Sequence, residues 1–379
     1  MSVFDTAWDR RSSGCNKWNR YEADVLPMWV ADMDFAVPPA VSDALAERLR
    51  QPILGYGMRR GPLLERIAAW MAAQYGWAVP PEAIVPLAGV VPGFNLALRA
   101  TCAPGSGVVL QTPLYPPMRA APAHWDLRRI EAPLTPADEV DMDAFGAAIR
   151  QAGQGAFILC NPHNPTGRVF RREELLAMAC ACVEAGVAIV SDEIHCDLVF
   201  DGRRHIPVAS LSPEIAARTI TLMSAGKTFN IAGLAVCWAV VTDPALRARF
   251  QAAIAGVSDH PNILGLIATE AALEHGEPWR QELLAYLRDN RDWLFQAVER
   301  DLPGVRMNLP EGTYLAWLDC RGSQAAADPA GFFVERARVA MNPGPDFGAA
   351  GQGFARFNFG CRRATLEEAV ARMAAALRN

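Results

Sequence analysis

The sequence is almost devoid of lysine. Only Lys17 and Lys227 are lysines among its 36 basic residues, and the rest are arginines. Arginine supplies surface charge, but its guanidinium stays protonated at biological pH and cannot act as a nucleophilic amine. A chain this poor in lysine is expected to keep one where an amine must lose its proton and attack a carbonyl. Lys227 is the candidate for such a Schiff-base lysine. The alternative is a chance surface residue, which is what we expect Lys17 to be.

Several other features are missing, and each absence argues against a class of protein. No segment approaches the roughly 18 uninterrupted apolar residues of a transmembrane helix, and the polar start lacks the apolar core of a signal peptide. The net charge of −5 gives no footprint for nucleic acid or an anionic membrane. Six scattered histidines form no ligand pair and nine cysteines no CxxC motif. We therefore expect a cytoplasmic protein with reduced thiols and no metal site.

Between residues 108 and 241, short apolar runs alternate with helical patterns. The runs are Val108–Leu110, Ala156–Cys160, Val187–Val190, Thr219–Met223 and Val236–Val241, with a helical pattern over Arg172–Ala185. Apolar strands separated by helices predict a parallel sheet covered on both faces. Ligands bind such sheets at the carboxyl ends of the strands. Polar clusters follow three of these strands, at Asn161–Gly167, Asp192–His195 and Ser224–Lys227.

The pattern changes after about Gly276. A long helical stretch over Trp279–Asp301 precedes strands near residues 313–318 and 356–359 and a final helix from about Leu366. We expect an N-terminal arm (residues 1–45) that packs with the small domain, a large domain (46–273) and a smaller α+β domain (274–379).

Two polar residues that follow strands are candidates to hold a flat ring. Asp192 closes a strand, where a buried carboxylate needs a cation or hydrogen bonds. A protonated pyridine nitrogen is such a cation, and a helix N-cap role is the alternative. Asn164 belongs to the segment Asn161–Gly167, in which two Asn-Pro steps and a Thr-Gly step force a rigid turn. Its amide could face a ring hydroxyl, or the motif could be a turn alone.

Other candidates would complete a site for a phosphorylated ring and an acidic substrate. Gly89, Val90 and Val91 precede a helical pattern, and free N–H groups there could cradle a phosphate, although glycine before a helix is common. Tyr115 follows another strand and could stack on a ring or pack in the core. Arg356 lies in an apolar strand and needs a planar anion, which is either a substrate carboxylate or a structural salt-bridge partner.

Together these motifs resemble the pyridoxal 5′-phosphate (PLP) enzymes of fold type I in the class I/II aminotransferase family. More closely, the chain is similar to the cystathionine β-lyase (C–S lyase, MalY/PatB-type) branch, for which the run Trp29–Phe35 is the best marker. The resemblance covers nearly the whole chain through Leu26–Phe35, Gly55–Gly57, Asn161–Gly167, Ser191–His195, the Lys227 segment and Arg356–Gly360. It implies an α/β, aspartate aminotransferase-like fold with a mostly parallel sheet in the large domain and a smaller α+β C-terminal domain.

The resemblance implies how PLP is held. Lys227 would bind it as a Schiff base and later move the substrate α-proton, and Asp192 would pair with the pyridinium nitrogen. Asn164 would contact the ring hydroxyl and Tyr115 would cover the ring. Ser224 and the amides around residues 89–91 would bind the phosphate.

The resemblance also implies substrate contacts and an assembly. Arg356 would clamp the substrate α-carboxylate, with Asn164 and Asp32 also at the substrate. Tyr56 would reach the phosphate of the neighbouring subunit, so a homodimer with shared active sites is expected.

Two positions depart from the aminotransferase pattern. Ala235 stands eight residues after Lys227, where aminotransferases usually carry a phosphate-binding arginine. His195 stands where many carry a tyrosine; it either touches the ring hydroxyl or only packs. The missing arginine weakens a plain aminotransferase assignment, and the string Ser191–His195 is typical of the lyase branch. The resemblance therefore implies α,β-elimination from an L-cysteine thioether such as cystathionine, which yields thiol, pyruvate and ammonia. An aminotransferase is the first alternative, and a PLP-binding regulatory protein is the second.

Overall fold

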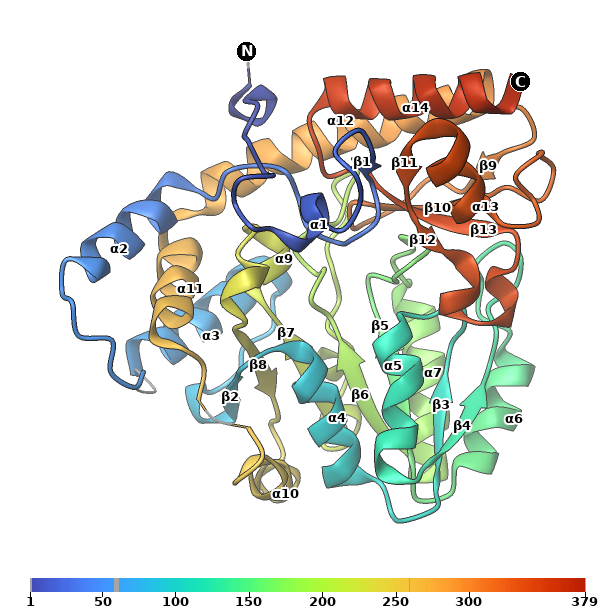
Figure 1. The fold of residues 1–379 in the computed structure, drawn as a ribbon. Helices are drawn as coiled ribbons and strands as arrows, with labels where there is room; N and C mark the ends of the chain where they lie inside the picture. Colours follow the sequence, from blue (N-terminus) through green and yellow to red (C-terminus); the bar gives the residue numbers. More distant parts are fainter. Residues whose placement is uncertain (1, 58–60, 259, 379) are drawn as a thin grey trace.

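The protein is described by a computed structural model that covers residues 2–57, 61–258 and 260–378 (Figure 1). Within these ranges the largest sheet has seven strands. Its order is β2 (Ile84–Leu87), β8 (Cys237–Val240), β7 (Thr219–Met223), β6 (Ala188–Asp192), β5 (Ala156–Cys160), β3 (Gly107–Leu110) and β4 (Arg128–Glu131). The predicted α/β class and mostly parallel sheet are confirmed.

One strand of this sheet differs from the expectation. The run at Val236–Val241 was expected among the parallel strands, but β8 is antiparallel to both of its neighbours, β2 and β7. The reason is the connection that precedes it. A parallel return needs a crossover, usually an α-helix that spans the sheet. The connection between Met223 and Cys237 has only single helical turns, Ala225–Thr228 and Ala232–Leu234, so the chain re-enters the sheet at the edge where it left. Lys227 lies in that connection.

Both faces of the sheet are buried. Along β5, Ala156 and Ile158 pack in a core with α4 (Val90–Thr101), whereas Phe157 and Leu159 pack with α6 (Met142–Ala152) and α7 (Arg172–Ala185). This alternation follows the two-residue period of a strand. Its consequence is that only the ends of the strands remain available for chemistry.

The C-terminal part has a second sheet, antiparallel throughout, which lies above the first in Figure 1. Its order is β12 (Asn342–Pro343), β13 (Phe354–Asn358), β10 (Leu315–Asp319) and β9 (Arg306–Met307), with α12 (Glu277–Asp301) and α14 (Arg363–Arg378) packed alongside. The N-terminal segment joins this part, because β1 (Leu26–Pro27) pairs in parallel with β11 (Val339–Ala340). The segment between residues 28 and 35 lies between the two sheets, because it is hydrogen-bonded both to Asn358 of β13 and to Lys227 and Asn230, which follow β7.

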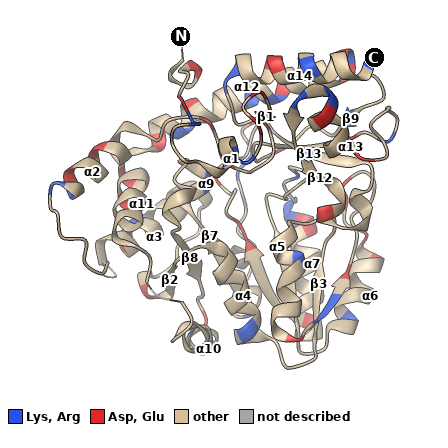
Figure 2. Cartoon of the chain, viewed as in Figure 1, with Lys and Arg blue, Asp and Glu red and all other residues tan. Residues whose placement is uncertain are grey.

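Further helices flank the large sheet, and charge is spread over their outer sides. They include α2 (Pro39–Leu49), α3 (Gly61–Tyr75), α10 (Pro244–Ile254) and α11 (Ile263–His275). Figure 2 shows basic and acidic residues interspersed along outer helices such as α12 and α14. None of the helices in the described ranges is both long and apolar enough to cross a bilayer.

Lys17 was expected on the surface, and that prediction is wrong. It lies in α1 (Asn16–Asn19), is 1% exposed, and its Nζ donates to Asp34 Oδ2 and to the Asp32 carbonyl, each at 2.8 Å. Arg10 binds the carboxylates of both aspartates. A buried ammonium is tolerated because this pairing compensates its lost hydration. Lys17 therefore anchors the N-terminal segment.

Candidate active site

A cavity of about 130 Å³ lies at the carboxyl edge of the large sheet, below the C-terminal part. The predicted residues that line it are Val90, Tyr115, Asn164, Asp192, His195, Lys227 and Arg356. They come from the ends of β2, β3, β5, β6 and β7 and from β13 of the second sheet. The carboxyl ends of parallel strands share one edge, which is why segments so far apart in sequence meet here.

Lys227 presents a free amine to this cavity. Its Nζ donates to the Ala31 carbonyl at 2.6 Å, and the half-buried side chain lies among the lining residues. Burial, and then the positive charge of Arg356, lower the pKa of Lys227 to about 8. About a tenth of the amine is therefore uncharged at pH 7 and about half at pH 8, and the uncharged form is the one that a nucleophile or a general base requires.

The turn that carries Lys227 is held by side chains on both sides. Helix α9 (Ala225–Thr228) has only four residues and cannot be stable by its own hydrogen bonds. Before it, the Ser224 hydroxyl donates to the Val236 carbonyl at 2.7 Å and accepts from the Gly226 amide at 2.9 Å. After it, Asn230 adopts a φ of 57° and its amide exchanges hydrogen bonds with the Met33 backbone at 3.0 and 3.2 Å.

Asp192 ends β6 and points into the cavity with little compensation. It is 2% exposed, and its Oδ1 accepts one hydrogen bond, from the Ile194 amide at 3.1 Å. No helix begins at this point of the chain, so the N-cap alternative does not apply. Among the described residues no basic side chain forms an ion pair with Asp192. Burial raises the pKa of Asp192 to about 7. Such a carboxylate is costly unless a cation meets it.

Arg356 is the complementary case, a buried cation held by neutral groups. Its Nη1 donates to Asn164 Oδ1 at 2.9 Å, and its Nη2 donates to the Trp29 carbonyl and to Asn342 Oδ1, at 3.0 and 2.6 Å. Its guanidinium also stacks on the Phe347 ring at 5.0 Å. No carboxylate pairs with it in the described parts of the chain, so the structural salt bridge weighed above is absent there. Burial lowers the pKa of Arg356 to about 10, which still leaves it charged at neutral pH.

Two aromatic rings complete the wall. His195 is 2% exposed with both ring nitrogens unbonded, and its ring meets Tyr314 edge-on at 5.8 Å. Burial, together with the charges of Lys227 and Arg356, lowers the pKa of His195 well below its usual value, so the ring is neutral. Tyr115 stands just before α5 (Pro116–Ala120), and burial raises the pKa of its phenol. Both rings therefore present uncharged faces.

The remaining predicted residues do not line this cavity. Gly89 (φ 119°) and Val91 belong to the start of α4, and Ser224 precedes α9 at the neighbouring strand end. Tyr56 is fully exposed. The Asp32 carboxylate is engaged by Arg10 at 2.9 Å rather than facing the cavity.

Sequence reasoning missed one group that touches Lys227. The Ala31 carbonyl accepts from Lys227 Nζ and also from the Tyr314 hydroxyl at 3.0 Å. A backbone carbonyl leaves no residue-type signal. The only hint in the sequence was that Ala31 lies within the run Trp29–Phe35.

Comparisons with known proteins bear on this arrangement. The family model "Aminotransferase class I and II" matches residues 23–373. Cystathionine beta-lyase PatB of Bacillus subtilis is 37% identical, with 99% of both chains covered. A crystal structure of OvoB superposes with a TM-score of 0.93 at 43% identity, covering 99% of this chain and 98% of that one. The PLP-bound C-S lyase from Staphylococcus hominis does so with 0.92 at 32% identity, over 99% and 98%.

Proposed function

Since the chain belongs to the family of class I and II aminotransferases, we propose that it is a PLP-dependent C–S β-lyase. It cleaves L-cystathionine or related L-cysteine thioethers to thiol, pyruvate and ammonia. The observation that carries the proposal is one cavity in which three groups are left without a charged partner: the Lys227 amine, the Asp192 carboxylate and the Arg356 guanidinium. The relatives named as lyases support elimination over amino transfer.

The residues present fit PLP. Lys227 offers the amine for its aldehyde, and Asp192 offers an uncompensated carboxylate for a protonated pyridine nitrogen. Asn164 and the unbonded nitrogens of His195 are available for the ring hydroxyl. We assign the phosphate to the starts of α4 and α9, because the first N–H groups of a helix have no partner within it. The residues concerned are Gly89, Val90, Val91 and Ser224, and Tyr115 would cover the ring.

The chain's own residues divide the work of elimination. When bound, PLP supplies an electron sink for the charge released at Cα. Arg356 and Asn164 bind the substrate carboxylate and so fix Cα relative to Lys227. Lys227, uncharged once freed, takes the α-proton, and the thiolate then leaves from Cβ. The released three-carbon enamine takes up one water molecule and yields pyruvate and ammonia.

The reaction itself is tested by leaving out the co-substrate of the main alternative. Holoenzyme incubated with L-cystathionine and no oxo acid should release thiol and pyruvate in equal amounts. An aminotransferase needs an oxo acid to complete its cycle, so turnover that strictly requires 2-oxoglutarate would contradict the lyase proposal. A stable protein partner combined with no elimination would favour the regulatory alternative instead.

Replacing Arg356 with glutamine should weaken substrate binding more than turnover. Buried charge-assisted hydrogen bonds are worth roughly 2–5 kcal/mol, so KM for L-cystathionine should rise about 100-fold while kcat falls less. Arg363→Gln is the matched control, because Arg363 also donates to an amide oxygen (Asn290, 2.9 Å) but lies outside the cavity. Equal KM values for Arg356→Gln and the control would show that Arg356 does not bind the substrate.

The assembly and compartment belong to the same proposal. Ile53, Leu54 and Tyr56 are 72%, 56% and 101% exposed, a run of large apolar side chains that a monomer rarely presents to water. A second copy of the chain covers this run in a homodimer and brings Tyr56 to the partner's phosphate site. The nine cysteines are all free thiols, which agrees with a reducing cytoplasm.

A further inference from the structure

Behind Lys227, on the side away from the cavity, the next residue in the chain is tied to a buried carboxylate. Thr228 Oγ1 donates to Asp197 Oδ2 at 2.8 Å, and both residues are buried. We propose that Asp197, acting through Thr228, is a positioning residue that sets where the Lys227 amine stands in the active site. The inference deepens the proposed function and rests on it for the role of Lys227.

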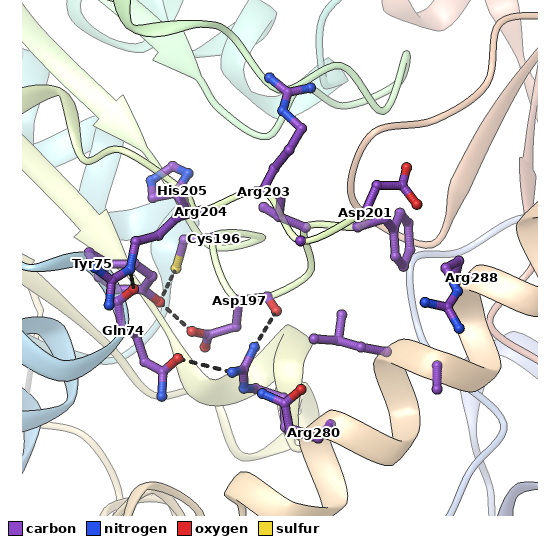
Figure 3. A pocket seen from close by; sticks show the side chains of 16 residues that line it. Gln74, Tyr75, Cys196, Asp197, Asp201, Arg203, Arg204, His205, Arg280 and Arg288 are labelled. Atoms are coloured by element: carbon purple, nitrogen blue, oxygen red, sulfur yellow. Dashed lines mark hydrogen bonds between the residues drawn. The ribbon is translucent and has the colours of Figure 1, made fainter.

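The Asp197 carboxylate is itself fixed by other donors. Its Oδ1 accepts from Trp70 Nε1 at 3.2 Å and from the Tyr75 hydroxyl, which also contacts Cys196 Sγ (Figure 3). With Thr228, three side-chain donors therefore converge on one carboxylate. A buried carboxylate needs such donors, and each donor in turn restricts its orientation.

The backbone of Asp197 is tied to the C-terminal part of the chain. Arg280 of α12 donates from Nη1 to the Asp197 carbonyl at 3.0 Å and from Nη2 to Gln74 Oε1 at 2.9 Å. These groups border a pocket of about 430 Å³ (Figure 3). Asp197 is therefore bonded to α12 through its backbone and to α9 through its side chain.

Lys227 depends on this anchor because its own helix is a single turn. The Ser224 hydroxyl holds Gly226 on one side of the lysine, Asp197 holds Thr228 on the other, and Asn230 anchors the segment that follows. Loss of the Thr228–Asp197 bond would leave the backbone on the C-terminal side of Lys227 without a side-chain anchor before Asn230. Displacement of a reacting group by about 1 Å can cost on the order of 100-fold in rate.

A role limited to stability predicts something different. Thr219 is a matched control: it is 1% exposed, against 0% for Thr228, and its Oγ1 donates to the Ile215 carbonyl at 2.7 Å. It begins β7, at the opposite end of the strand that leads to Lys227. Thr219→Val and Thr228→Val each remove one buried hydroxyl bond. Both variants should lower the thermal stability, Thr228→Val by somewhat more because its bond is to a carboxylate, but only Thr228→Val should disturb the lysine.

The first test measures the reactivity of the Lys227 amine directly, in cofactor-free protein. A short pulse of acetic anhydride at a series of pH values, followed by mass spectrometry, gives the pH dependence of Lys227 acetylation. Half-maximal reactivity is expected near pH 8 in the unaltered chain. Thr228→Val should raise that midpoint by about one pH unit, because a loosened amine gains hydration and keeps its proton to higher pH. Lys227→Ala gives the background from Lys17.

The second test uses holoenzyme. Thr228→Val should lower kcat for pyruvate release about tenfold and leave KM within about twofold, because the substrate carboxylate site is untouched. In an Asp197→Ala background, Thr228→Val should add no further loss, since both changes break the same bond. If either variant fails to fold, Tyr75→Phe removes one outer donor and should shift both readouts in the same direction, by less.

The outcomes are separable. If Thr228→Val and Tyr75→Phe match Thr219→Val in the acetylation midpoint and in kcat, the positioning role is wrong and the bond is only structural. If the unaltered enzyme shows no elimination, the proposed function fails. The acetylation midpoint still decides the inference in that case, because it requires neither PLP nor substrate.

Discussion

Lys227→Ala is expected to abolish the visible absorbance of bound PLP and to lower pyruvate release from L-cystathionine by about 10⁴-fold. The variant removes the amine that binds the cofactor aldehyde and the base that takes the α-proton, and a positioned base alone contributes roughly 10²–10⁴-fold. No other side chain can replace it. The second lysine, Lys17, is buried in its bonds to Asp34 and the Asp32 carbonyl.

The measurement is borohydride reduction of holoenzyme followed by peptide mass spectrometry. A pyridoxyl adduct is expected on the peptide that contains Lys227. Lys17→Arg is the natural control, because it removes the only other lysine of the chain and keeps the charge beside Asp34; this variant should retain the colour and the adduct. Unchanged absorbance in Lys227→Ala would show that the lysine assignment is wrong.

Asp192→Asn is expected to lower kcat by about 10³-fold, equivalent to roughly 4 kcal/mol in activation free energy. An amide can donate a hydrogen bond to the unprotonated pyridine nitrogen but cannot stabilise the protonated, positively charged form, so the ring becomes a poor electron sink. PLP should still be bound through Lys227. The expected result is therefore a coloured but slow enzyme, seen by comparing absorbance with pyruvate release. Full activity in a coloured Asp192→Asn enzyme would rule out the ion pair with the ring.

The same variant should have the opposite effect on the stability of cofactor-free protein. Burial raises the pKa of Asp192 to about 7, so the folded state holds a proton that the unfolded state releases near the usual value of 3.8. Stability from this group is therefore present below about pH 4 and is lost as pH rises toward 7. Asp192→Asn removes the buried charge and with it this loss of stability, so it should raise Tm at pH 8 but not at pH 4.

Asp201→Asn provides a control of opposite sign for that stability measurement. A hydrogen bond from Arg291 lowers the pKa of Asp201, so its contribution is present at neutral pH and disappears in acid. Asp201→Asn should therefore lower Tm at pH 8. If both variants shifted Tm in the same direction at pH 8, the uncompensated burial of Asp192 would not be the cause.

Much of the fold could be predicted from the sequence because its signals are local. The runs Ala156–Cys160 and Thr219–Met223 coincide with β5 and β7, and Arg172–Ala185 coincides with α7. Burial on both faces makes such strands apolar throughout, and the helix between them keeps its own period. The direction of β8 could not be predicted from the sequence, because an apolar run is compatible with either strand direction. The connection before β8, which has no crossover helix, decides the pairing.

The candidate site was predictable to the extent that residue type limits chemistry. Lysine is the amine that can lose a proton, so its scarcity drew attention to Lys227. The sequence did not predict the position of Lys17. It was expected on the surface, but it is a lysine retained for a buried ion pair with Asp34. Asp197 and Thr228 gave no signal, since buried carboxylates and threonines occur in any core.

The sequence by itself determined which functional groups the chain possesses and which of them follow the strands of a parallel sheet. Tertiary structure alone decided their charge states and partners: that Arg356 faces Asn164 across 192 residues, that no carboxylate in the described ranges neutralises it, and that Asp192 lies buried beside Lys227. The physical reason is that residue identity is local, whereas desolvation and Coulomb interactions depend on whatever the fold brings within a few ångströms.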